Sequence, residues 1–134
     1  MPRQVKSTDT EKITINLGYV DLGRIDLLVE EGFYTNRTDF IRAAIRAQLG
    51  SHTAEVGALI ERRTLDIGLR DFSREDLEAA RAKGELLHIK VVGLARLAPD
   101  ISTELARGTI GSINVLGALQ ATPEQRAALK DRIT

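Results

Sequence analysis

The chain has no cysteine, no tryptophan and no net charge, since 19 basic residues balance 19 acidic ones. Without cysteine, disulfides and thiolate metal sites are excluded, and a reducing cytoplasm is the natural setting. No apolar run approaches the length of a membrane span, because Lys90 and Arg96 interrupt the longest candidate. The amino terminus is polar and lacks the apolar core of a secretory signal. We therefore expect a cytoplasmic protein.

Catalytic and metal-binding signatures are also missing. His52 and His88 are the only histidines, and no cysteine accompanies them. A lone histidine in an apolar strand, as at His88, is usually structural. The sequence shows no glycine-rich phosphate loop of known spacing and no nucleophile–base pair. We expect no enzyme activity, no metal and no cofactor.

A length of 134 residues fits one ordinary domain or two very small ones. Apolar residues make up 43% of the chain and charged residues 28%, which is typical of soluble globular proteins. The zero net charge argues mildly against a nucleic-acid binder. The placement of the charges is more informative than their sum, because Arg3, Lys6 and Lys12 cluster near the amino terminus.

Polar and apolar residues alternate strictly from Lys12 to Leu17. This period of two, with β-branched residues, predicts a β-strand with one dry face. The polar face carries Lys12, Thr14 and Asn16, and the apolar face carries Ile13, Ile15 and Leu17.

Two predicted helices follow this strand. The first runs from about Val20 to Glu31, and Gly32 suits the left-handed residue that closes a helix. The second begins at Asn36, which is followed three residues later by Asp39 in the manner of a capping box. Its apolar stripe consists of Phe40, Ile41, Ala44, Ile45 and Leu49.

A unit of about forty residues with one strand is too small to bury a stable core as a monomer. Pairing the strand with its copy across a two-fold axis would solve this problem and make folding and dimerisation inseparable.

These elements, in this order, resemble the ribbon–helix–helix family of bacterial DNA-binding proteins, the CopG-, Arc- and MetJ-type regulators. The resemblance rests on the strings ITINL, DLGRIDLLVEEG and FYTNRTDFIRAAIRAQL, and it covers about residues 11–49. It implies an intertwined homodimer whose antiparallel ribbon enters the major groove of double-stranded DNA.

The resemblance also implies which residues contact DNA. Lys12, Thr14 and Asn16 would read base edges, while the free amides around Thr35, Asn36 and Arg37 would bind a phosphate at a helix start. The base-reading residues also fit the wet face of an ordinary edge strand, and Arg37 and Arg42 also fit a surface or salt-bridge role. Arg3 and Lys6 would form an arm along the DNA backbone, or else an ordinary frayed terminus.

The second half alternates between strand and helix patterns. Residues 51–63 are helix-like and connect the two halves, with a break or hinge at Gly50. Leu65, Ile67 and Leu69 alternate as in a strand, Ser73 begins a capped helix that closes at Gly84, and residues 87–97 form an apolar strand. Thr122 and Pro123 begin the last helix.

A repeat with a constant offset of 24 residues runs through this half. The matching pairs are Ile89 and Ile113, Val91 and Val115, Gly93 and Gly117, Pro99 and Pro123, and Leu105 and Leu129. Leu65 and Ile67 lie one such period before Ile89 and Val91, as a degenerate first copy would. This period matches short α/β solenoids, in which stacked copies share a core. The parallel sheet would have edges that another subunit covers.

We therefore predict an α+β protein with three parts: a ribbon–helix–helix DNA-binding domain with an arm (1–50), a connecting helix (51–63), and an oligomerisation module of strand–helix repeats with parallel strands (64–134). The expected function is a nucleoid-associated transcriptional regulator, a repressor, dimeric or of higher order. Two alternatives stay open. One is an antitoxin that binds a toxin partner through its second half, and the other is a structural or DNA-organising protein that polymerises through its repeats.

Overall fold

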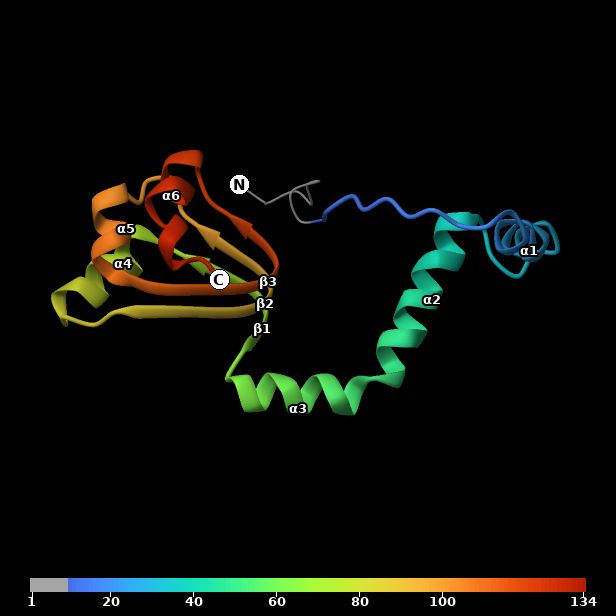
Figure 1. Cartoon of the computed structure of the whole chain (residues 1–134), viewed down its shortest axis with the longest axis horizontal. Helices are drawn as coiled ribbons and strands as arrows, with labels where there is room; N and C mark the ends of the chain where they lie inside the picture. The colour runs from blue at the N-terminus through green and yellow to red at the C-terminus, as the bar shows by residue number, and fades with distance from the viewer. Residues whose placement is uncertain (1–9) are drawn as a thin grey trace. The chain divides into compact units, whose positions relative to one another are not determined.

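The computed structural model describes residues 10–134, which form two compact units, residues 10–59 and 60–134 (Figure 1). The predicted arm residues Arg3 and Lys6 lie outside the described residues. None of the described helices is both long enough and apolar enough to cross a membrane.

The first unit contains helices α1 (Tyr19–Glu30) and α2 (Arg37–Ser51), and helix α3 (Thr53–Arg63) leads out of it. The observed α1 is shifted by one residue from the predicted 20–31 helix. Residues 11–18 have no regular secondary structure, so the predicted strand is not formed in the single chain. The physical reason is that a strand requires a neighbour for its backbone hydrogen bonds, and these residues have none within the described chain.

Backbone hydrogen bonds close α1 where the sequence predicts it. Gly32 has a φ of 85°, its amide donates to the carbonyl of Val29 at 3.1 Å, and the amide of Phe33 donates to Leu28 at 2.9 Å. This pair of bonds is a Schellman motif, which needs a left-handed residue at the position of Gly32. Helix α3 ends in the same way at Thr64, whose φ is 54°. There the amide of Leu65 donates to Ile60 at 2.9 Å.

The first unit buries very little of its apolar surface. Among residues 10–59, Ile25 is the one hydrophobic side chain that is buried, with 7% exposed. The exposed large apolar side chains of this unit are Ile13, Ile15, Leu17, Tyr19, Val20, Leu27, Phe33, Ile45, Leu49 and Leu59. A unit with one buried apolar side chain lacks the core that would hold it folded alone.

The second unit alternates strands with helices. Its elements are β1 (Asp66–Phe72), α4 (Arg74–Ala82), β2 (Leu87–Leu97), α5 (Thr103–Thr109), β3 (Ile110–Gln120), α6 (Pro123–Ala128) and the 3₁₀ turn η2 (Lys130–Arg132). The three strands form one parallel sheet in the order β1-β2-β3. Helices α4, α5 and α6 all lie on the same side of this sheet (Figure 1).

The strand register reproduces the sequence repeat in its second step. Ile89 pairs with Ile113 and Gly93 with Gly117, which keeps the offset of 24 residues. The first step is different, because Gly68 pairs with Gly93 at an offset of 25. The predicted alignment of Ile67 with Val91 is therefore wrong by one residue. The glycines fix the true register.

Gly68, Gly93 and Gly117 form a row across the sheet. Their φ angles are 121°, 136° and 119°, a region that side-chain-bearing residues rarely adopt. A Cβ on Gly93 would lie 2.2 Å from the carbonyl oxygen of Gly68, and a Cβ on Gly117 would lie 2.1 Å from that of Gly93. Figure 1 shows β2 and β3 bending sharply partway along their length. The glycine row supplies the backbone conformation and the close approach that such a bend requires.

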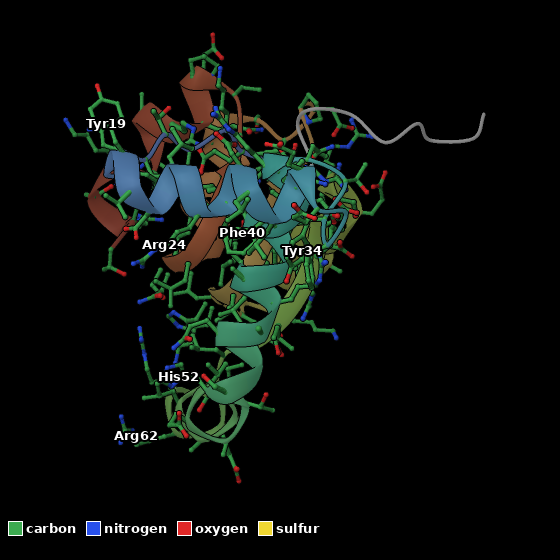
Figure 2. All side chains as sticks on the ribbon, turned by 90° about the vertical axis from the view of Figure 1, so that its right-hand side faces the viewer. Tyr19, Arg24, Tyr34, Phe40, His52 and Arg62 are labelled. Atoms are coloured by element: carbon green, nitrogen blue, oxygen red, sulfur yellow. The ribbon has the colours of Figure 1, made fainter. Side chains whose placement is uncertain are left out.

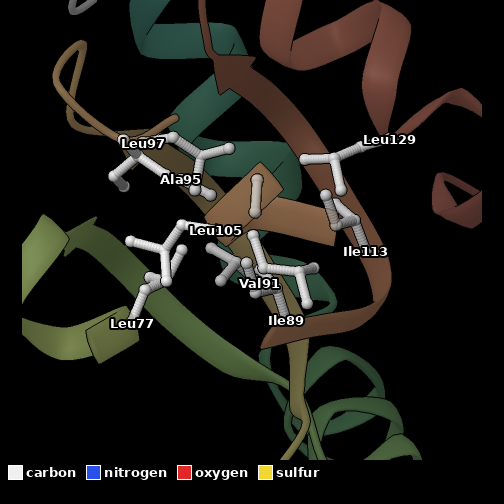
Figure 3. Packing of buried hydrophobic residues seen from close by; sticks show 11 residues of the cluster. Leu77, Ile89, Val91, Ala95, Leu97, Leu105, Ile113 and Leu129 are labelled. Atoms are coloured by element: carbon white, nitrogen blue, oxygen red, sulfur yellow. The ribbon is translucent and has the colours of Figure 1, made fainter. Parts of the chain in front are cut away.

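The core lies inside this bend, between the sheet and its helices. Each helix contributes one leucine that is at most 5% exposed: Leu77 from α4, Leu105 from α5 and Leu129 after α6. They pack with strand residues of one contiguous cluster, which includes Ile89, Val91, Ala95, Leu97, Ile110 and Ile113 (Figure 3). The leucine offset of 24 residues is thus a packing period.

Candidate nucleic-acid interface

Residues 11–18 form the first part of the candidate interface. Both faces of this segment are in solvent: Lys12, Thr14 and Asn16 are exposed, and so is every apolar residue between them. Ile13 is 74% exposed, Ile15 59% and Leu17 41%. An ordinary edge strand would pack its apolar face on its own chain. This segment leaves that face uncovered, and three apolar side chains in alternation are available to another molecule.

The start of α2 forms the second part. The Asn36 side chain accepts a hydrogen bond from the amide of Asp39 at 2.8 Å, which is the predicted N-cap. The carboxylate of Asp39 accepts from the amide of Thr35 at 2.9 Å. The amide of Thr35 is therefore already bonded, and the expectation that it is free is wrong. Within the described residues, the amides of Arg37 and Thr38 form no hydrogen bond.

The side chain of Arg37 is held on α1. Its Nε donates to Asp26 Oδ1 at 2.7 Å and its Nη2 donates to Asp26 Oδ2 at 2.8 Å. The hydrogen bond from Arg37 and then its positive charge lower the pKa of Asp26, while the bond to Asp26 raises the pKa of Arg37. This two-point geometry fixes a guanidinium better than a single contact does. In this state, Arg37 offers a backbone amide to a ligand and does not offer a free charge.

A shallow hollow lies at the same helix start. Its lining residues are Thr35, Asn36, Thr38, Asp39 and Arg42. Among the described ion pairs Arg42 has no partner, so its positive charge remains available beside the amides of Arg37 and Thr38. The carboxylate of Asp39 in the same hollow opposes an anion. Sequence reasoning assigned Arg42 to the surface, although its position about one turn after the cap places it near the helix start.

An aromatic contact supports the turn between the two helices. The rings of Tyr34 and Phe40 meet edge to face, with centroids 5.0 Å apart and planes at 87° (Figure 2). This arrangement is favourable beyond the area that it buries. The contact connects the residue before the cap to the first turn of α2. The hollow is therefore built on a fixed helix start.

Comparisons with known proteins bear on both units. The model of the Ribbon-Helix-Helix transcriptional regulator family matches residues 8–126. A curated relative, the transcriptional regulator CdrS of Halobacterium salinarum, is 31% identical over 48 residues, which are 36% of this chain and 87% of that protein. No solved structure gives a significant match.

The family match extends the limits that the sequence suggested. The recognised strings end at Leu49, whereas the matched region continues through the second unit into α6. The strand–helix repeats are therefore part of the pattern that this family model describes, and they are not an unrelated addition. The chain belongs to the ribbon–helix–helix transcriptional regulator family.

Proposed function

We propose that this protein is a sequence-specific DNA-binding transcriptional regulator, a repressor, that functions as a dimer. In the dimer, residues 11–18 of two copies pair as an antiparallel ribbon. The observation that supports this most directly is the first unit's lack of a core, with one buried hydrophobic side chain among residues 10–59. The family to which the chain belongs is one of transcriptional regulators.

Ribbon formation would correct the deficit in buried surface. Pairing supplies backbone hydrogen bonds to residues 11–18 and places Ile13, Ile15 and Leu17 of both copies on one face. Full burial of an aliphatic side chain is worth about 1.5–3 kcal/mol, so three side chains per copy form a substantial part of a small unit's stability. Folding of this unit and dimerisation are then one process.

The same pairing would place Lys12, Thr14 and Asn16 of both copies on the opposite face. A two-stranded ribbon fits the major groove of DNA, where each base pair has its own pattern of donors and acceptors. Lysine suits the acceptors of guanine, asparagine suits adenine, and threonine suits several bases. The exposure of all three side chains leaves them available for such contacts.

The hollow at the start of α2 would bind a backbone phosphate. The amides of Arg37 and Thr38, the positive end of the α2 dipole and the charge of Arg42 all favour an anion there. The Arg37 side chain would then act as a positioning group, since its pair with Asp26 ties the helix start to α1. Phosphate contacts set the register of the protein on DNA and carry no sequence information.

The test is DNA binding by alanine variants of the base-reading residues. Asn16→Ala and Lys12→Ala should each cost about 1–3 kcal/mol on the preferred site and relax discrimination at one base position. Arg42→Ala should weaken binding to all sequences and reduce the salt dependence, since it would remove a phosphate contact. Lys83→Ala, an exposed lysine of the second unit, is the control and should leave affinity unchanged. Equal weakening on all sequences by Asn16→Ala and Lys12→Ala would contradict base reading.

A further inference from the structure

The two outer edges of the sheet in the second unit are different. On the β3 edge, the amide of Thr134 donates to the carbonyl of Ile113 at 2.9 Å, and Ile133 forms a parallel bridge with Ile113. The Arg132 guanidinium also donates to the carbonyl of Ile110 at 2.7 Å. The terminal residues therefore cover the amino-terminal half of this edge.

The β1 edge has no such cover within the described residues. Strand β1 pairs with β2 alone, and its outer side carries no partner strand. Gly68 shows this directly, because a Cβ added there would meet nothing within 4 Å, whereas Gly93 and Gly117 each abut the glycine of the previous strand. Such an edge is a template for another strand.

Strand β1 also has a polar pair across its bend. Asp66 and Arg70 are four residues apart, which is about 13 Å in a straight strand. Their side chains nevertheless form an ion pair at 2.8 Å, with Gly68 midway between them. The strand therefore has a centre at Gly68, with a carboxylate before it and a guanidinium after it.

We propose that the β1 edge is an interface between two copies of this chain, in which β1 pairs antiparallel with β1 of the second copy about a two-fold axis at Gly68. In this register, Asp66 lies opposite Arg70 of the second copy, and Ile67 lies opposite its Leu69. Gly68 faces its own copy, which keeps the two bends in step. Opposite charges meet, apolar meets apolar, and the glycine row continues into the second copy.

Neighbouring registers lose this agreement. A shift by one residue sets Asp66 against the second copy's Asp71, two like charges directly opposite, which destabilises a pair of strands. A shift by two sets Gly68 against Arg70 and puts the bends out of step. The charges are exposed, so they select the register more than they add affinity. The apolar residues add burial, since Ile67 is 68% exposed and Leu69 46%.

This interface closes on itself. A two-fold contact uses the same surface on both copies, whereas a head-to-tail stack would need a free β3 edge for the β1 edge of the next copy. The terminal residues occupy part of that β3 edge. The proposal therefore favours discrete oligomers over filaments. It concerns residues 66–72 and does not depend on DNA binding.

Disulfide cross-linking of single-cysteine variants tests the register, because the natural chain has no cysteine. Ile67→Cys and Leu69→Cys replace exposed side chains and are co-expressed as full chains with different tags, then oxidised mildly. Opposed residues of antiparallel strands have Cβ atoms about 4.5–5.5 Å apart, close to disulfide reach. We expect the 67–69 heterodimer in at least tenfold excess over either cross-linked homodimer.

Lys90→Cys, on the neighbouring strand, is the matched control for random collision between associated chains. Its cross-linked yield should stay at background level. A dominant 69–69 homodimer, or no 67–69 product above the Lys90→Cys level, would overturn the proposal. DNA affinity of the two variants is measured in parallel. Loss of cross-linking with intact DNA binding counts against this interface alone, and the reverse result counts against the proposed function alone.

Discussion

Asp26 and Arg37 form a two-point ion pair that links α1 to the first turn of α2, with contacts of 2.7 Å and 2.8 Å. The sequence alone offers Arg37 as a DNA contact or as a salt-bridge residue. The structure shows the salt bridge, and it leaves the Arg37 amide and the Arg42 side chain facing the candidate phosphate hollow. Arg37 therefore positions the helix start.

The ion pair predicts an acid-sensitive contribution to stability. The Arg37 hydrogen bond lowers the pKa of Asp26 in the folded state, so the stabilisation is fully present above the unfolded pKa, about 3.9. It is lost as the pH falls through the lowered pKa. Asp26→Asn should thus reduce the melting temperature at pH 7, and the difference from the unaltered protein should shrink toward pH 2–3. Melting curves over this range measure it.

Asp21→Asn is the control, because Asp21 contacts Arg24 at 4.0 Å in a loose, exposed pair. Its melting temperature should differ little from that of the unaltered protein at any pH. A difference for Asp26→Asn that is constant from pH 7 to pH 2 would contradict the assigned role of the carboxylate.

The glycine row predicts a sharp intolerance of alanine at its inner positions. Gly93→Ala and Gly117→Ala would each put a Cβ within 2.2 Å of a backbone oxygen and a side chain at a φ above 115°. Overpacking and backbone strain together should cost about 3 kcal/mol or more. Chemical denaturation at a fixed protein concentration measures the loss.

Gly57→Ala makes the same chemical change in the middle of α3, where a Cβ meets nothing within 4 Å. It should raise stability by about 0.5–1 kcal/mol, because alanine favours a helix over glycine. Equal effects at positions 57 and 93 would refute the steric explanation.

Thr64 offers a stabilising substitution. It holds a φ of 54° at the end of α3, a conformation that costs an L-residue about 1–2 kcal/mol and suits a β-branched residue least. Thr64→Gly should raise stability by about 0.5–1 kcal/mol after the greater unfolded-state freedom of glycine is counted. Arg62→Gly, inside the last turn of α3, should instead lower it. A stability loss on Thr64→Gly would mean that the threonine side chain contributes a contact that outweighs the strain.

Gln125 is a buried polar residue on which the connection after β2 depends. It is 1% exposed, and its Nε2 donates to the carbonyls of Ala98 and Ile101, both at 2.9 Å. Gln125→Leu would leave both carbonyls without a partner and should lower the free energy of unfolding by about 1–3 kcal/mol. Glu124→Leu, at the exposed neighbouring position, should change it by less than about 0.5 kcal/mol. Similar values for the two variants would contradict this role.

Local patterns predicted much of this fold. Both helices of the first unit, the caps at Asn36 and Ser73 and the parallel pairing of β2 with β3 agree with the sequence, because each depends on short-range spacing. The predicted strand at residues 12–17 is absent from the single chain, because its formation depends on a second molecule.

Other features could not be derived from spacing alone. The offset of 25 between β1 and β2 is set by the stacking of Gly68 on Gly93, and one extra residue between the strands hides it. The pairing of Arg37 with Asp26 and the burial of Gln125 depend on tertiary contacts between separate elements. Arg42 was visible in the sequence, but its place in the hollow required the geometry of the helix start.

The pairing of residues 11–18 between copies is the central claim, and isotope-filtered NMR tests it most directly. A full-length sample that combines ¹³C,¹⁵N-labelled and unlabelled chains reports contacts between copies only. The account predicts inter-chain nuclear Overhauser effects among residues 12–17, with Ile13, Ile15 and Leu17 on the buried side. Random-coil shifts for this segment, with inter-chain contacts confined to other residues, would contradict it.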